Sequence, residues 1–248
     1  MKIIAYTALL YGVDYLQYAI KSVIDHVDEY HVIYDATGSG SHGHVTNLIC
    51  PDTRWQLINL ASNAAGDKLR WHDAGPFAHE GMQREAIHQY APDADVILVL
   101  DADEIWPDGL APSCISLAEM NSHIARWRVP IIHYWRSFYR CVLHDPAFPE
   151  RVIRKGGDGT AQVPFNVPIN HMGYAQRSEI VEFKQHTHGH KNEWRHDCDW
   201  FNDKFMANAQ TDCHPVGSEY WNPESVDPLD YMPAFMVYHP YFNLEVIP

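Results

Sequence analysis

The stretch "VILVLDADEIWPDG" (residues 96–109) runs five apolar residues directly into three carboxylates, Asp101, Asp103 and Glu104. A continuous run of Val, Ile and Leu is typical of a strand that is buried on both faces, as in a parallel sheet covered by helices. Like charges at this spacing repel one another, so they are not placed at a strand end for stability. The segment therefore predicts a buried strand that ends in a solvated turn, a helix cap or a site that holds a cation.

The elements before this stretch alternate between strand and helix. Hydrophobic patterning predicts strands over residues 2–9, 30–35 and 55–60, and helices over residues 15–27, with Asp14 as the N-cap, and 78–92. On the second helix, Met82, Ala86, Ile87 and Tyr90 are expected on one face. This β-α-β order predicts an α/β fold with a mixed, mostly parallel sheet flanked by helices. Ligands of such sheets bind at the carboxyl ends of the strands, where Asp35 and Asp101 both fall.

The pattern changes after about residue 110. Extended chain interrupted by Pro130 is expected over residues 123–140, a strand over 151–155, and helices over 177–185 and 197–210, the last capped by Asp197. The final thirty residues are rich in proline and are expected to be irregular. Because no linker or repeat is visible, we expect one domain over residues 1–248, with a first half (1–110) and a second half with a C-terminal elaboration (111–248).

Composition narrows the classes of partner and compartment. A formal net charge of −14 argues against a nucleic-acid partner, although the basic residues between positions 126 and 155 do not exclude a nucleic-acid acceptor. Five scattered cysteines form no C-x-x-C pair, so free thiols in a reducing cytoplasm are expected. No apolar run approaches the roughly 18 residues of a membrane span, and "MKIIAYTALLYG" is interpreted as a first strand rather than a signal peptide.

The paired aspartates suggest a chemistry. Asp101 and Asp103 lie one residue apart in the turn after a buried strand, where both can direct oxygens at one divalent ion. Mg²⁺ and Mn²⁺ prefer oxygen ligands and often share them with substrate phosphates. A diphosphate bound to such an ion becomes a better leaving group, because the metal neutralises the charge that develops on it.

Three segments together resemble a known family. The strand ending in "HVIYDATGSGS", the "REAI" helix and "VILVLDADE" are similar in kind and order to the GT-A glycosyltransferases, especially family 2, over about residues 1–110. The resemblance implies a GT-A (nucleotide-diphospho-sugar transferase-like) fold and a metal-dependent hexosyl- or related transferase. It further implies Mn²⁺ or Mg²⁺, a nucleotide-sugar donor bound by the first half, and a glycan, lipid-linked or other hydroxyl acceptor bound by the second.

The resemblance also implies roles for individual residues. Asp35 would contact the base or ribose of the nucleotide, and Arg84 would lie near the donor. Asp101 and Asp103 would hold the metal and the diphosphate. The chain departs from the family at "DATGSGS", where a more acidic run is usual, which leaves the choice of nucleotide open; Asp35 as a plain turn residue and Arg84 as a solvated helix residue are the alternatives.

The second half holds a weaker resemblance. "RVIRK" followed by "INHMGYAQRSEIVEFK" is similar to the region after the D-x-D motif in some family members. It implies that His171 completes the metal site and that Arg151, Arg154 and Lys184 face the diphosphate, where Arg can form bidentate contacts.

An inverting transfer also needs a carboxylate that deprotonates the acceptor hydroxyl. The candidates are Asp199, Glu104 and Asp197, of which Asp197 is more simply explained as a helix cap. A retaining enzyme needs no base in the same place, and the residues leave both outcomes open.

Two other classes of function remain. In "HTHGHKNEWRHDCD", His186, His188, His190 and His196 could bind a transition metal, which favours a hydrolase-like metalloenzyme. The chain could also be a non-catalytic carbohydrate-binding protein, whose sugar binding would survive the loss of Asp101 or Asp103. In a transferase, aromatic residues of the second half could stack on the sugar rings of the acceptor, although most are more simply explained as core: Trp127, Tyr134, Trp135, Phe138, Tyr139, Trp194 and Trp200.

Overall fold

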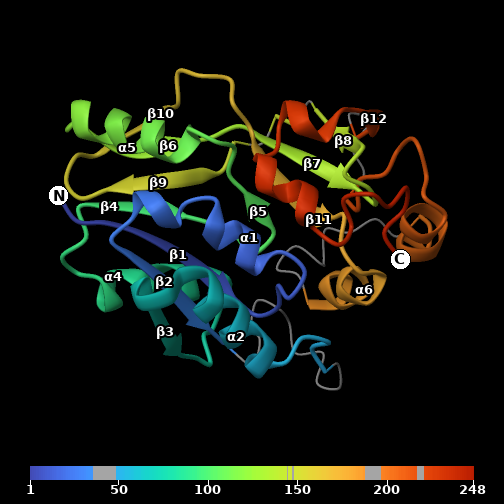
Figure 1. The fold of residues 1–248 in the computed structure, drawn as a ribbon, viewed down its shortest axis with the longest axis horizontal. Helices are drawn as coiled ribbons and strands as arrows, with labels where there is room; N and C mark the ends of the chain where they lie inside the picture. Colours follow the sequence, from blue (N-terminus) through green and yellow to red (C-terminus); the bar gives the residue numbers. More distant parts are fainter. Residues whose placement is uncertain (36–48, 144, 147, 188–196, 217–220) are drawn as a thin grey trace.

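A seven-stranded, mostly parallel sheet forms the larger part of the molecule (Figure 1). The structure is a computed structural model that describes residues 1–35, 49–143, 145–146, 148–187, 197–216 and 221–248. The strand order is β10 (Gly159–Gln162), β6 (Ile124–Arg128), β9 (Glu150–Arg154), β4 (Val96–Val99), β1 (Ile3–Leu9), β2 (Glu29–Tyr34) and β3 (Leu69–Asp73).

The strands that pair with β1 determine where this sheet can bind a ligand. β1 pairs in parallel with β2 on one side and with β4 on the other, and β3 follows β2 in parallel. The chain therefore builds outward from β1 in one direction and then crosses to its other side, which is a topological switch point. β9 runs antiparallel between β4 and β6. The predicted mixed, mostly parallel sheet flanked by helices is confirmed.

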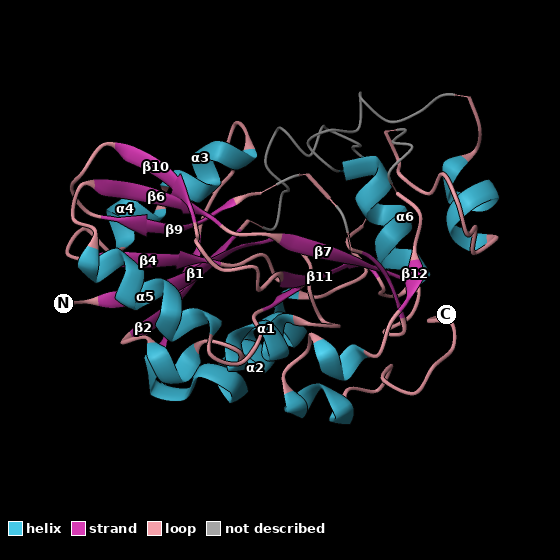
Figure 2. Cartoon of the chain, turned by 90° about the horizontal axis from the view of Figure 1, so that it is seen from above, coloured by secondary structure: helices cyan, strands magenta, loops and turns pink. Residues whose placement is uncertain are grey.

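Helices cover both faces of this sheet (Figure 2). Helices α1 (Leu16–Lys21), α2 (Arg54–Ala65) and α5 (Leu110–Met120) lie on one face, and the short helices α3 (Glu80–Glu85) and α4 (Ile87–Tyr90) lie on the other. Residues of β4 alternate between the two hydrophobic clusters, Val96 and Leu98 facing one and Ile97 and Val99 the other. The strand is buried on both faces, as the apolar run predicts.

A second, five-stranded sheet extends from the first (Figure 1). Its order is β12 (Glu224–Ser225), β8 (Arg140–Val142), β7 (Ile131–Trp135), β11 (Ile169–Tyr174) and β5 (Glu104–Ile105). Because β4 belongs to the first sheet and β5 to the second, the turn at Asp101–Asp103 crosses between them. The turn is closed by the amide of Glu104, which donates to the carbonyl of Asp101 at 3.0 Å.

The remaining elements follow the second sheet. Helix α6 (Ser178–Thr187) and a π-helical turn (Trp200–Met206) pack with Trp135, Tyr174 and Trp221 in a third cluster. Short 3-10 turns lie at Ile24–His26, Gly66–Lys68, Pro228–Asp230 and Ala234–Tyr238. The sequence predictions of strands 2–9, 30–35, 96–100 and 151–155, of extended chain around Pro130 and of helix 177–185 are confirmed.

The predicted strand over residues 55–60 is wrong, because this segment is part of α2. Thr53 caps the helix, and its side chain and that of Gln56 satisfy each other's backbone amides in a capping box. Only Leu57, Ala61 and Ala65 are buried, at helical spacing. The third strand of the sheet is β3, which begins at Leu69.

Replacing Thr53 with alanine should lower the free energy of unfolding by about 1 kcal/mol, because the amide of Gln56 loses its capping acceptor. The melting temperature should fall by roughly 2–4 °C in calorimetry. Thr53→Ser keeps the hydroxyl and should stay close to the unsubstituted protein. Equal losses in both variants would show that the methyl group, not the cap, stabilises this helix start.

Three local predictions are corrected. Asp14 does not cap α1. The N-cap position is Tyr15, which makes no side-chain capping bond, and the carboxylate of Asp14 instead accepts a hydrogen bond from Arg177 at 2.8 Å. The helical turn after residue 197 is capped by Asp199, not Asp197, through the amide of Asn202. Met82 and Tyr90, expected on the buried face, are 45% and 40% exposed.

Further sequence predictions concern cysteines, membrane spans and one loop. Among the described residues, no disulfide joins any of the five cysteines. Among the residues that the structure describes, we find no helix with the length and apolar character needed to cross a bilayer. The Gly/Ser loop over residues 36–43 lies outside the described residues.

Candidate active site

A cavity of about 610 Å³ lies at the carboxyl ends of β1 and β4. Its lining combines the D-x-D turn with side chains from α3, β7, β9, β11 and α6, so both sheets contribute. This is the edge at which an open α/β sheet binds its ligands. The volume falls in the range of about 300–1,000 Å³ that small-molecule sites usually have.

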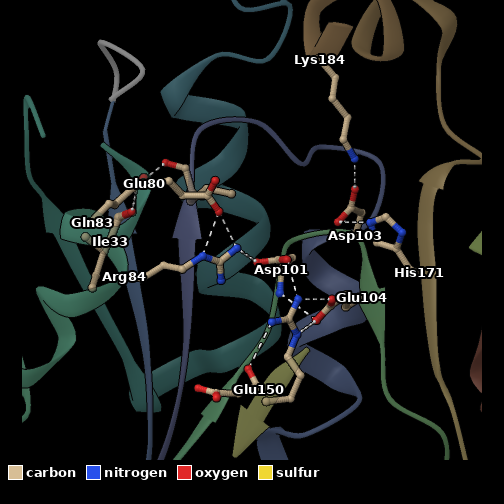
Figure 3. A network of polar contacts seen from close by, with 12 residues as sticks. Ile33, Glu80, Gln83, Arg84, Asp101, Asp103, Glu104, Glu150, His171 and Lys184 are labelled. Atoms are coloured by element: carbon tan, nitrogen blue, oxygen red, sulfur yellow. Dashed lines mark hydrogen bonds and ion pairs between the residues drawn. The ribbon is translucent and has the colours of Figure 1, made fainter. Parts of the chain in front are cut away.

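Asp101 is held between two arginines (Figure 3). Arg84 from α3 donates to its Oδ1 at 2.6 Å, and Arg151 from β9 donates to its Oδ2 at 2.8 Å. Burial raises the pKa of the Asp101 carboxyl, but the charges of Arg84 and Arg151 outweigh it and hold that pKa well below its usual value. Asp101 is therefore a carboxylate whose two oxygens are both already bound to arginine.

Arg151 also binds Glu104, the third carboxylate of the turn. Its Nε and Nη2 donate to the two oxygens of Glu104 at 2.8 and 2.6 Å, and Glu104 is fully buried. Burial raises the pKa of Glu104 above its usual value in spite of Arg151. Because both oxygens face Arg151, Glu104 is suited to orient the arginine rather than to accept a proton from an acceptor hydroxyl.

Asp103 turns away from the arginines and meets α6 and β11 (Figure 3). Lys184 Nζ lies 3.4 Å from its Oδ2, and His171 Nε2 lies 3.6 Å from its Oδ1. Burial raises the pKa of Asp103, but Lys184 and His171 lower it below the usual value. Burial lowers the pKa of His171 to about 3, so the imidazole is neutral at pH 7. The turn thus presents a carboxylate and a neutral imidazole side by side.

A group of ion pairs lies just before α6, the helix that carries Lys184. Arg177 binds Asp14 at 2.8 Å, Asp52 at 2.5 Å and Glu179 at 2.5 Å. Asp52 also accepts hydrogen bonds from the backbone amides of Gly12 and Val13, which follow β1. These contacts therefore connect the loop after β1 to the start of α6.

Three residues of the cavity wall were missed by the sequence analysis. His133 on β7 lies with its Nδ1 at 2.7 Å from Nδ1 of His171, and its Nε2 is 3.1 Å from Oδ2 of Asp145. Trp221 donates its indole N–H to the same Asp145 oxygen at 2.9 Å. The only signal in the sequence is a histidine within an otherwise apolar strand, "IIHYW", which by itself does not indicate a site.

The structure brings some predicted site residues together and leaves others apart. Arg84, Asp101, Asp103, Glu104, Arg151, His171 and Lys184 all line the cavity. Asp35 is buried at the end of β2, where its carboxylate accepts a hydrogen bond from the amide of Phe77 at 3.2 Å. It does not line the cavity. The same is true of Arg154, Asp197 and Asp199.

The predicted histidine cluster lies mostly outside the part of the chain that the structure describes. His188, His190 and His196 lie outside the described residues; His186 lies in the last turn of α6. Within the parts of the chain that are described, no three His, Cys, Asp or Glu side chains gather as a ready metal-ligand set.

Comparisons with known proteins match part of the chain. No family model matches the sequence, and no curated protein matches it. Among solved structures, Staphylococcus aureus TarS residues 1–349 matches over 54% of this chain, with a TM-score of 0.39 and 13% identity. A mycobacterial protein matches over 55% of the chain, with a TM-score of 0.35 and 17% identity. Glucosyl-3-phosphoglycerate synthase from Mycobacterium tuberculosis matches over 54% of the chain, with a TM-score of 0.34 and 16% identity.

The matches are partial on both sides. The chain spans 36%, 41% and 44% of the lengths of these solved chains, which is less than half of each. The third structure holds Mn²⁺, uridine-diphosphate-glucose and phosphoglyceric acid. Over about half its length, the chain is thus similar to these three solved structures.

Proposed function

We propose that the chain is a single-domain glycosyltransferase that moves a sugar from a nucleotide-diphospho-sugar to an acceptor hydroxyl. The observation that supports this most directly is the cavity at the carboxyl ends of β1 and β4, in which a D-x-D turn faces Arg84, Arg151 and Lys184. Carboxylates and cations held together at such an edge suit a ligand that is itself a metal-bound anion.

The charge of this network supports a divalent cation. Four carboxylates (Glu80, Asp101, Asp103 and Glu104) face three cations (Arg84, Arg151 and Lys184), which leaves one net negative charge. A diphosphate alone would be repelled by this excess. A divalent ion that enters with the diphosphate reverses the sign of the site and favours binding.

Asp103 and His171 fit such an ion better than Asp101 does. Their facing atoms are 3.6 Å apart, too far for a hydrogen bond, and a carboxylate oxygen and an imidazole nitrogen placed side by side in this way would both be able to act as ligands of one divalent ion. Mg²⁺ and Mn²⁺ usually take few protein ligands and complete their shell with water and phosphate oxygens. In this proposal, the bound ion neutralises charge on the leaving diphosphate.

The chain's own cations would bind the donor beside the ion. Arg84 lines the cavity, and its Nη1 is buried and has no hydrogen-bond partner among the described residues. We assign to it a phosphate oxygen of the donor, with which a guanidinium forms strong charge-assisted bonds. Lys184 supplies a second positive charge, and Asp101 holds Arg84 in place. A contact of Asp35 with the nucleotide remains a prediction.

A thermal-unfolding panel of nucleoside diphosphates with and without Mn²⁺ tests the proposal. One nucleotide at about 100 times its dissociation constant should stabilise the fold by roughly 2.7 kcal/mol and raise the melting temperature by roughly 5–10 °C, only with the metal. Asp103→Asn should abolish the rise, and Asp108→Asn, an exposed position five residues on, should keep it. No rise with any nucleotide, with Mn²⁺ or Mg²⁺ present, would contradict the proposal.

A further inference from the structure

His171 has two ring nitrogens, and the one that faces away from Asp103 contacts a second histidine. Strands β7 and β11 pair in parallel with His133 opposite His171. Their Nδ1 atoms are 2.7 Å apart, and the rings stand nearly perpendicular, with centroids 4.8 Å apart. At that distance one Nδ1 carries a hydrogen and the other accepts it.

Asp145 decides which of the two histidines donates. Nε2 of His133 lies 3.1 Å from Oδ2 of Asp145, and the indole of Trp221 donates to that same oxygen. The His133 contact is not aligned as a regular hydrogen bond. Even so, a carboxylate oxygen attracts an N–H and repels a nitrogen lone pair. Because Asp145 is closer to Nε2 of His133, at 3.1 Å, than Asp103 is to Nε2 of His171, at 3.6 Å, a hydrogen belongs on Nε2 of His133.

The hydrogen on Nε2 of His133 determines which ring nitrogen of His171 carries a hydrogen. With its hydrogen on Nε2, His133 can only accept at Nδ1, so Nδ1 of His171 must donate. Neutral His171 then has a lone pair, not a hydrogen, on Nε2. That lone pair lies 3.6 Å from Oδ1 of Asp103, so two electron-pair donors face each other at the cavity wall.

We propose that Asp145 and His133 are positioning residues that fix His171 in the Nδ1–H tautomer and so present its Nε2 lone pair, beside Asp103, to a divalent cation. This inference rests on the metal role proposed above and extends it to two residues outside the D-x-D turn. A ligating histidine is commonly oriented through a hydrogen bond of its other nitrogen. Here that partner is a second histidine, and a carboxylate holds the second histidine in turn.

The test combines a tautomer measurement with a metal titration on the full chain. In metal-free protein, long-range ¹H–¹⁵N spectra distinguish the histidine tautomers, and the His171 signals are assigned by their loss in His171→Asn. The unsubstituted protein should show His171 as the Nδ1–H tautomer. His133→Phe keeps a ring at the site but removes the acceptor, so His171 should lose this preference.

The metal titration uses Mn²⁺ without nucleotide. Affinity should fall roughly tenfold to hundredfold in His133→Phe, the usual effect of removing such an outer partner. His72→Phe is the matched control, because His72 also contacts a histidine of the neighbouring strand, His31, through ring nitrogens 3.1 Å apart, but it does not line the cavity. It should leave both the His171 tautomer and the Mn²⁺ affinity unchanged.

The outcomes separate this inference from the proposed function. His171 in the Nε2–H tautomer in the unsubstituted protein would overturn the inference, and so would an unchanged Mn²⁺ affinity in His133→Phe alongside a loss in His171→Asn. If the unsubstituted protein binds no Mn²⁺ at all, the metal site and this inference both fail. Nucleotide binding in the thermal panel would still report on the donor site by itself.

Discussion

Replacing Arg151 with methionine should lower the free energy of unfolding by about 3–5 kcal/mol at pH 8. Arg151 is buried and binds both oxygens of Glu104 and one oxygen of Asp101. Without it, fully buried Glu104 has lost its cation, whereas Asp101 still binds Arg84. The loss comes from a charge left without a partner in a low-dielectric interior.

This loss should shrink as the pH falls. Burial already raises the pKa of Glu104, and removal of Arg151 raises it further. A carboxyl whose pKa is raised in the folded state takes up a proton on folding at intermediate pH, so the stability of the variant increases as pH falls through that range. The penalty should therefore be smaller at pH 5 than at pH 8, as measured by urea unfolding with an unchanged m-value.

Two further variants make the Arg151 result specific. Arg151→Met with Glu104→Gln removes the unpaired charge and should recover most of the lost stability at pH 8. Arg126→Met removes an exposed arginine that pairs with Glu150 at 2.8 Å, and it should cost less than about 1 kcal/mol. A loss of unfolding free energy below 1 kcal/mol in Arg151→Met, or a loss independent of pH, would show that Glu104 does not form an ion pair with Arg151 in the folded protein.

Asp103→Asn should reduce kcat/KM for sugar transfer by a hundredfold to a thousandfold. Losses of this size accompany removal of one group that stabilises charge at a reacting centre. The substitution keeps the shape of the side chain but removes the charge that Lys184 and, in the proposed complex, the divalent ion both face. The assay follows release of nucleoside diphosphate from the donor that the nucleotide panel identifies.

The activity loss must be separated from a loss of stability. Asp103→Asn leaves Lys184 buried without its carboxylate, so the fold should be weakened at neutral pH, and the assay must run well below the measured melting temperature. Higher Mn²⁺ should restore part of the activity, because one of two protein ligands remains at His171. Activity within about threefold of the unsubstituted protein would show that Asp103 takes no part in the reaction. Asp108→Asn is the control substitution, and its activity should equal that of the unsubstituted protein.

The errors in the sequence analysis arise where two explanations of one pattern compete. Residues 55–60 have strand-like composition, but the Thr53–Gln56 capping box and burial at every fourth residue make a helix. Asp197 and Asp199 both suit an N-cap, and only the backbone geometry selects Asp199. By contrast, the apolar run at 96–100 is short and rich in β-branched residues, which favours a strand covered on both faces over a buried helix.

The sequence by itself determined the α/β alternation, the buried strand before the D-x-D turn, and the position of that turn at the ligand-binding edge. These follow from periodicity and burial, which act over a few neighbouring residues. Only the tertiary structure decided that Arg84 and Arg151 hold Asp101, that Lys184 and His171 meet Asp103, and that His133 and Asp145 stand behind His171. Those partners come from strands and helices far apart in the chain, and strand order and register, which depend on how the whole core packs, bring them together.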